Sequence, residues 1–304
     1  MSNPEIDALR AVIAARPRPA ELSEMRAGID TRGLANGVAD DVTVVPVNAA
    51  GVPAEWTSTP NAIANRAILY FHGGGYVIGS LDSHRHLVAQ MGRAAAAAVL
   101  ALGYRLAPEC PFPAPIEDAL AGYRFLLAQG YLPGSIALAG DSAGGGLVVA
   151  AMVAIRDAGL PQPACGWTIS PWIDMESTGA SITGKAAEDP GVQKAGLDFM
   201  AKAYLGGADP KHPLASPLHA DLTGLAPLLI QVGAAETLLD DSTRLAALAG
   251  AAHVAVTLEI WPEMLHVWHV YHRQLAAARK AIANGGAFVR AVMDGTTPVT
   301  PRVG

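Results

Sequence analysis

The sequence has 304 residues, of which 51% are hydrophobic and 16% charged, and its formal net charge is −6. This composition supplies a large core and excludes an intrinsically disordered chain. The acidic balance, with no run of Lys and Arg, argues against a nucleic-acid partner. The most apolar stretch, residues 94–102, is too short to cross a bilayer, so we expect no stable membrane insertion.

The N-terminal residues and the cysteines favour a cytoplasmic protein. Glu5 and Asp7 precede the first arginine and no long apolar block follows, unlike a secretory signal. Cys110 and Cys165 provide no disulfide framework, and we expect both to be reduced thiols.

The first predicted element is an amphipathic helix over residues 4–15, which two prolines end. From residue 42 onward, strands and helices alternate. The expected strands cover residues 42–47, 67–71, 98–104, 136–139, 165–170, 228–232 and 254–260. The expected helices cover residues 84–96, 116–129, 144–158, 192–205, 242–251 and 269–293, the last interrupted around residues 284–286.

This alternation predicts an α/β fold with a mostly parallel sheet covered by helices on both faces. The segment 175–217 has no strong strand and reads as an insertion at the carboxyl edge of the sheet. We therefore expect a catalytic domain over residues 42–304 with a cap insertion at about 175–217. Residues 1–41 would form an N-terminal cap segment over the same cleft.

The sequence Gly-Asp-Ser-Ala-Gly-Gly at 140–145 lies between a predicted strand and a predicted helix. In that context Gly-x-Ser-x-Gly forms a nucleophile elbow, a strained turn that exposes a serine hydroxyl. The glycines are needed because a Cβ would clash with the neighbouring strand and helix. Ser142 is therefore the candidate nucleophile.

A serine nucleophile needs a base, which comes last in the α/β-hydrolase order of Ser, acid, His. His266 lies in the loop between the last strand and the last helix and is our candidate. His253 begins a strand pattern, whereas His269 and His272 have solvent-facing spacing within the predicted last helix.

The acid is expected after the strand at 228–232, where three carboxylates compete. Glu236 is nearest to the strand end and is preferred, with Asp240 as the alternative. Asp240 and Asp241 also suit the first turn of the next helix, where acidic side chains complement the helix dipole.

Oxyanion donors are expected from His-Gly-Gly-Gly-Tyr at 72–76, directly after a buried strand. Glycines leave backbone amides unshielded and free to adopt positive φ. We assign the backbone N–H groups of Gly74, Gly75 and Ala143 to the oxyanion hole, with His72 fixing the loop.

Together these motifs resemble the hormone-sensitive-lipase-like esterases, the bacterial family IV group of α/β-hydrolases. The matching segments are 72–76, 104–109 (Tyr-Arg-Leu-Ala-Pro-Glu), 140–145 and 262–266 (Pro-Glu-Met-Leu-His), in the family's order. Glu236 stands where the family usually has Asp, and Cys110 where it usually has His. We interpret the segment 104–109 as structural.

The resemblance implies an α/β-hydrolase fold, no cofactor or metal, and a serine carboxylesterase acting on short-chain ester substrates; members often form homodimers. Amidase or formamidase activity would use the same triad, and long-chain lipase activity is disfavoured by the short cap. A non-catalytic receptor is disfavoured because His266 is present.

Candidate pocket walls are Tyr76, Trp172 and Met175, each after a strand's carboxyl end. Phe199 and Tyr204 of the cap are alternatives.

Overall fold

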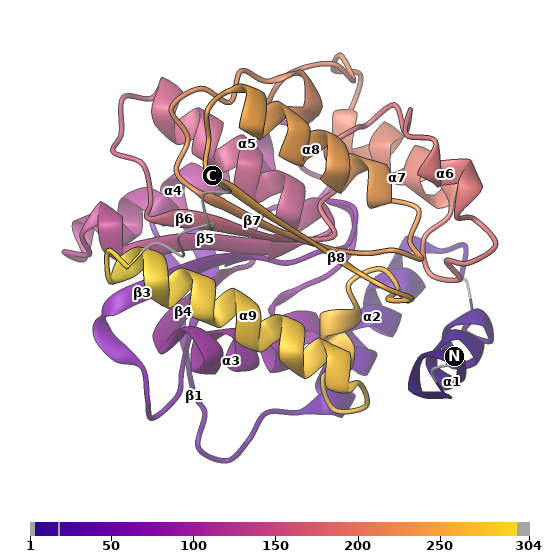
Figure 1. Ribbon diagram of the computed structural model, residues 1–304, viewed down its shortest axis with the longest axis horizontal. Helices are drawn as coiled ribbons and strands as arrows, with labels where there is room; N and C mark the ends of the chain where they lie inside the picture. Colours follow the sequence, from indigo (N-terminus) through magenta and orange to yellow (C-terminus); the bar gives the residue numbers. More distant parts are fainter. Residues whose placement is uncertain (1–3, 18, 297–304) are drawn as a thin grey trace, which may run out of the picture.

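Eight strands form one sheet in the computed structural model, which describes residues 4–17 and 19–296 (Figure 1). Their order is β1-β2-β4-β3-β5-β6-β7-β8, with β1–β2 and β2–β4 antiparallel and the remaining pairs parallel. The parallel α/β fold that the sequence predicts is confirmed. The strands are β1 (Thr43–Ala49), β2 (Val52–Ser58), β3 (Ile63–Phe71), β4 (Ala97–Leu102), β5 (Ile136–Asp141), β6 (Cys165–Ile169), β7 (Leu228–Gly233) and β8 (Val256–Trp261).

Helices cover both faces of the sheet (Figure 1). Helices α4, α5 and α8 pack on one face, and α3 and α9 on the other. Consecutive side chains of a strand point to opposite faces, so Leu69 and Phe71 of β3 join the first core and Ile68 and Tyr70 the second. The helices are α1 (Pro4–Ala14), α2 (Leu22–Asn36), α3 (Leu81–Ala95), α4 (Ala114–Ala128), α5 (Ala143–Asp157), α6 (Ser181–Gly184), α7 (Lys194–Leu205), α8 (Leu239–Ala251) and α9 (Ala276–Met293).

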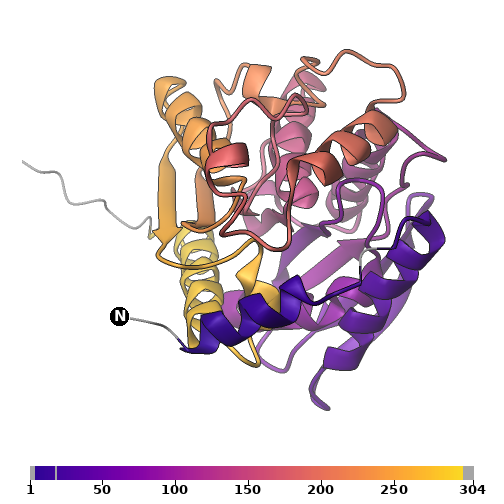
Figure 2. The same cartoon turned by 90° about the vertical axis from the view of Figure 1, so that its right-hand side faces the viewer.

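Helices from two distant parts of the chain lie along the carboxyl side of the sheet (Figure 2). Helices α1 and α2 lie on one side of this edge, and the segment with α6 and α7 on the other. Helix α1 packs Ile6, Leu9 and Ile13 onto the loop after β8.

Strand β2 and helix α2 were not predicted. Strand β2 contains Pro53 and Glu55 and lacks a simple apolar alternation. Helix α2 has no apolar stripe, and Gly33 is its one buried residue. A Cβ at Gly33 would overlap the Ser83 backbone, so close approach to α3 replaces side-chain packing. Arg26 anchors the same helix by donating to the carbonyls of Val77 and Ala107.

The predicted interruption of the last helix at 284–286 is wrong, because α9 runs unbroken from Ala276 to Met293. A Cβ at Gly285 would overlap the Trp167 ring, and one at Gly286 would overlap Ala94 of α3. These glycines therefore permit close packing rather than break the helix.

The predicted solvent-facing placement of His269 and His272 is also wrong. Both precede α9 and are buried. A ring nitrogen of His269 lies 3.0 Å from Gln231 Oε1, and His272 lies 3.1 Å from His86. Burial lowers the pKa of both imidazoles, to about 3 for His269 and, with help from Arg273 and Arg279, to about 4 for His272. The two histidines that were expected on the solvent-facing side of the last helix therefore belong to a buried layer of polar side chains.

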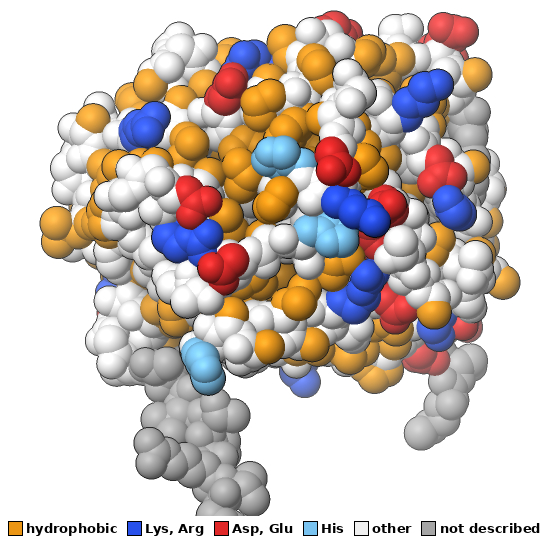
Figure 3. All heavy atoms as spheres, turned by 90° about the horizontal axis from the view of Figure 1, so that it is seen from above, with side chains coloured by type: hydrophobic (Ala, Val, Ile, Leu, Met, Phe, Trp, Pro, Cys, Tyr) orange, Lys and Arg blue, Asp and Glu red, His pale blue; other side chains and the backbone are white. Residues whose placement is uncertain are grey.

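The described surface carries mixed charge. One face shows Lys, Arg, Asp and Glu interspersed among hydrophobic side chains (Figure 3). Within residues 4–17 and 19–296, no helix combines the length and apolarity needed to cross a membrane. Cys110 and Cys165 are free thiols, and burial raises the pKa of Cys165 to about 12.

Candidate active site

Ser142 occupies a sharp turn between β5 and α5. Its backbone has φ 54° and ψ −121°, a conformation that costs a non-glycine residue about 1–3 kcal/mol. A Cβ at Gly140 would overlap the Gly144 carbonyl, and one at Gly144 would overlap the Phe71 carbonyl. The strained turn thus depends on both flanking glycines, as the sequence argument requires.

His266 and Glu236 face one another across the ends of the last two strands. His266 Nδ1 lies 2.7 Å from Glu236 Oε2. Glu236 is fully buried, and its Oε1 accepts from Ser170 Oγ at 2.8 Å and the Gly233 N–H at 2.6 Å. Three donors therefore hold the carboxylate beside the imidazole.

The pKa of His266 is raised above its ordinary value of 6.5. Burial lowers it, but the hydrogen bond and negative charge of Glu236 outweigh burial, with smaller contributions from Asp189 and Asp141. An imidazole held this way can take up a proton and be stabilised as the imidazolium.

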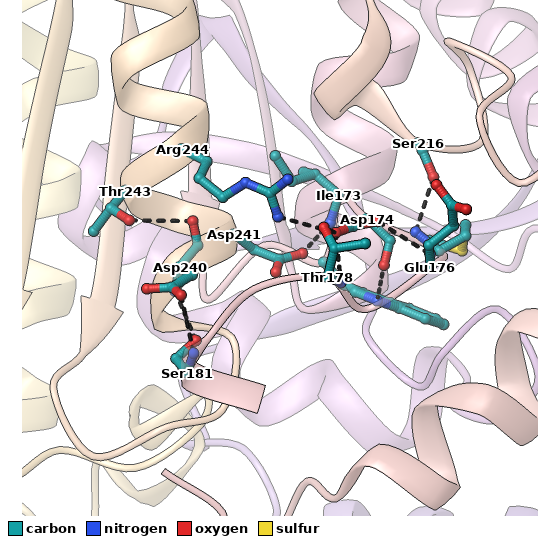
Figure 4. A network of polar contacts seen from close by, with 12 residues as sticks. Ile173, Asp174, Glu176, Thr178, Ser181, Ser216, Asp240, Asp241, Thr243 and Arg244 are labelled. Atoms are coloured by element: carbon teal, nitrogen blue, oxygen red, sulfur yellow. Dashed lines mark hydrogen bonds and ion pairs between the residues drawn. The ribbon is translucent and has the colours of Figure 1, made fainter. Parts of the chain in front are cut away.

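Asp240 and Asp241 serve other contacts (Figure 4). Asp240 Oδ2 accepts the N–H of Ser181 at 2.9 Å, which ties α8 to α6. Asp241 Oδ2 accepts the N–H of Ile173 at 2.9 Å. Of the three acidic residues in this loop, the structure brings Glu236 to His266.

The glycine loop after β3 lies against the elbow. Gly74 and Gly75 have φ of 120° and 62° and border the same cavity as Ser142. Ala143 is the first residue of α5, where backbone N–H groups lack intrahelical partners. His72 is buried behind the loop, with Nδ1 2.8 Å from the Gly73 carbonyl oxygen. Burial, with the charge of His84, lowers the pKa of His72 to about 4, consistent with a structural role.

Asp141 contributes a contact that sequence reasoning missed. Its Oδ1 accepts the Gly73 N–H at 3.0 Å and the Tyr70 hydroxyl, and Oδ2 lies 3.3 Å from His84 Nε2. Burial raises the pKa of Asp141, but His84, Tyr70 and His72 outweigh burial and lower it to about 2. The signal was present in the hexapeptide, where an ionisable side chain precedes the nucleophile.

A cavity of about 610 Å³ connects these groups. Ser142, His266 and Trp172 line it together with Gly74 and Gly75. Volumes of this size suit small-molecule ligands. The segment around α7 contributes Val192, Leu197 and Met200, and the N-terminal segment contributes Ile13, Arg16, Ile29 and Arg32.

Two predicted wall residues lie behind this cavity rather than in its lining. Tyr76 is buried and stacks on Tyr204, with ring centroids 3.8 Å apart. Met175 is buried and donates its N–H to Ser216 Oγ. Phe199 points to solvent with 47% exposure. Of the predicted wall residues, Trp172 lines the cavity, and further walls come from helices α1, α2 and α7, whose placement over the sheet edge depends on tertiary contacts.

One cluster outside the cavity has the composition of a cation site. Ligand atoms of Asp174, Glu176 and His219 lie within 4.8 Å of one another. Asp174 already accepts from Arg244 at 3.0 Å and from Thr178 (Figure 4). These contacts satisfy the Asp174 carboxylate without a bound cation.

Comparison with known proteins gives consistent matches. Residues 68–270 match a family described as having the alpha/beta hydrolase fold. An acetyl-hydrolase of Streptomyces hygroscopicus is 50% identical over 95% of this chain and 97% of its own length. A crystal structure of an esterase from the bacterial hormone-sensitive lipase family superposes with a TM-score of 0.94 at 50% identity, covering 96% of this chain and 99% of that one. A crystal structure of EstE5 soaked with p-nitrophenyl butyrate has a TM-score of 0.93 at 48% identity and covers 96% and 100%.

Proposed function

Because this chain belongs to the α/β-hydrolase family and is a carboxylic ester hydrolase akin to the hormone-sensitive-lipase esterases, we propose that it hydrolyses short-chain acyl esters through Ser142, His266 and Glu236. The observation that carries the proposal is the 2.7 Å contact between His266 Nδ1 and buried Glu236, beside a cavity that also exposes the strained Ser142.

The first half-reaction forms an acyl-enzyme. His266 Nδ1–H donates to Glu236, which leaves Nε2 free to take the proton of Ser142 Oγ as that oxygen attacks the ester carbonyl. Glu236 stabilises the resulting imidazolium. The N–H groups of Gly74, Gly75 and Ala143 bind the oxyanion, and His266 then gives its proton to the leaving alcohol.

The second half-reaction releases the acid. Water replaces the alcohol, His266 Nε2 takes a proton from it, and the hydroxide oxygen attacks the acyl carbonyl. Collapse of the second tetrahedral intermediate returns the proton to Ser142 Oγ and frees the carboxylic acid. No step requires a cofactor.

We further propose that residues 1–41 and about 175–217 act as a cap on the catalytic domain of residues 42–304. Ile13 and Arg16 of the first segment, and Val192 and Met200 of the second, line the cavity that contains Ser142. Walls built from both segments limit the length of the chain that enters. Short acyl groups are therefore favoured over long ones.

A p-nitrophenyl ester series from acetate to laurate tests this function, with the matching anilides to detect amidase activity. We expect the highest kcat/KM at acetate or butyrate and loss of turnover in Ser142→Ala, with circular dichroism unchanged. A serine-directed phosphonate should label Ser142 in the wild type. Labelling at another residue, or full activity of Ser142→Ala, would refute the mechanism.

A further inference from the structure

The N-terminal side of the cavity carries two arginines, Arg16 after α1 and Arg32 within α2, called here the arginine pair. Both line the cavity that contains Ser142 and His266. As whole residues, Arg16 is half-buried and Arg32 is exposed.

Neither member of the arginine pair has a carboxylate partner among the residues that the structure describes. Arg16 Nη1 donates to the Tyr271 hydroxyl at 2.9 Å and lies over that ring, 5.6 Å from its centroid. The Arg32 guanidinium has no hydrogen-bond partner within the described chain. Eight other arginines do form ion pairs with carboxylates: Arg10, Arg26, Arg66, Arg85, Arg93, Arg105, Arg156 and Arg244.

The carboxylates that line the same cavity are already occupied. Asp141 is bound by Tyr70, Gly73 and His84, as described above. Asp189 accepts the N–H groups of Gly191, Val192 and Thr237 at 2.9, 2.9 and 3.0 Å. Neither carboxylate forms an ion pair with the arginine pair in the described structure.

The two guanidinium groups also interact electrostatically. Although Arg32 is exposed as a whole residue, partial burial of its guanidinium group and the charge of Arg16 lower its pKa. Two like charges near a partly enclosed cavity repel, and an anion between them converts that repulsion into attraction. Arginine binds a carboxylate through paired N–H donors, which makes it suited to that anion.

We propose that the arginine pair binds a carboxylate at the remote end of the substrate, so that the preferred esters are half-esters carrying a free carboxylate. Ile13 and Ile29 lie on the same two helices and line the cavity, where they provide apolar contact for the methylene chain between the ester and the carboxylate. This inference rests on the proposed function, because it concerns the cavity of Ser142.

The test compares mono-4-nitrophenyl adipate with 4-nitrophenyl heptanoate, which has a similar chain length and no charge. We expect the wild type to favour the adipate half-ester. The ratio of the two kcat/KM values should fall about tenfold in Arg32→Gln and in Arg16→Gln, the range for losing a charged hydrogen bond. Arg124→Gln, an exposed position on α4, should leave the ratio unchanged. Added salt should lower the wild-type ratio.

A second measurement does not depend on turnover. Adipate should raise the melting temperature of the wild type and have a smaller effect on Arg32→Gln. Equal ratios and equal adipate shifts in wild type and variants would overturn the inference. If the wild type fails to hydrolyse p-nitrophenyl acetate and butyrate, the proposed function fails, while the adipate shift still decides whether the arginine pair binds a carboxylate.

Discussion

Asp141 accepts the backbone N–H of Gly73 at 3.0 Å, so the residue before Ser142 holds the loop that carries the proposed oxyanion donors. The elbow and the glycine loop come from neighbouring parallel strands, β5 and β3. The Asp141 contact therefore fixes the spacing between Ser142 and the amides of Gly74 and Gly75.

Asp141→Asn should lower kcat more than it raises KM. The variant weakens the contacts that orient the loop but leaves the cavity walls in place, so the loss should approach the roughly 10²-fold effect of removing an oxyanion donor. Steady-state kinetics with p-nitrophenyl butyrate provides the measurement. A change confined to KM would contradict the positioning role.

Glu236→Gln should lose about 10⁴-fold in kcat, because an amide cannot hold the imidazole tautomer or stabilise the imidazolium. Asp240→Asn is the matched control from the same loop. It should retain activity near wild type, since Asp240 binds Ser181 of α6. The reverse ranking would show that Asp240 is the acid.

The acid limb of kcat/KM should have its midpoint above pH 6.5. The reaction needs neutral His266, and Glu236 raises the pKa of this imidazole in the folded protein. Activity therefore disappears as pH falls through that raised value. NMR titration of the His266 ring should give a lower pKa in Glu236→Gln, because burial then acts without the opposing charge.

The free energy of unfolding depends on the same pKa of His266, but it falls as pH rises, whereas activity increases. A folded-state pKa above the unfolded value means that the folded protein binds the proton more tightly. The pairing of His266 with Glu236 thus stabilises the fold fully below the unfolded pKa, and this contribution is lost as pH rises through the folded pKa. Urea unfolding of wild type and His266→Ala at several pH values measures the difference.

Gly285→Ala should destabilise the protein by about 1–3 kcal/mol, since its methyl group would overlap the Trp167 ring. Gly250→Ala in α8 is the matched control. Among the described residues, no heavy atom outside the adjacent residues and the backbone of the same helix lies within 4 Å of a Cβ there, and alanine should add up to about 1 kcal/mol by its helix propensity. Thermal or urea unfolding of both variants measures the contrast.

Local sequence was sufficient for the parts of the site that depend on local geometry. The elbow needs two glycines around a serine, and the loop after β3 needs glycines with positive φ, so both patterns are readable in the chain. The position of His266 followed from the strand–loop–helix order. These features belong to the carboxyl ends of parallel strands, which meet at one edge of the sheet.

Features that depend on tertiary contacts were harder to predict from the sequence. The bonds of Glu236 to Ser170, Gly233 and His266 distinguish it from Asp240, and no local pattern reports them. Helix α2 has no apolar stripe because a glycine contact and Arg26 hold it. Gly285 resembled a helix break because a close helix–sheet approach and a break both require glycine.

Helix α1 packs on the loops that carry Glu236 and His266, far from it in the sequence. Its apolar residues share one cluster with Ala235, next to Glu236, and with Leu265, next to His266. Arg10 of α1 also donates to the carbonyl of Glu263 at 3.0 Å. Helix α1 thus supports both loops that carry Glu236 and His266. If the proposed triad is correct, deleting α1 should lower kcat, and heating should impair turnover once α1 detaches, before the sheet itself unfolds.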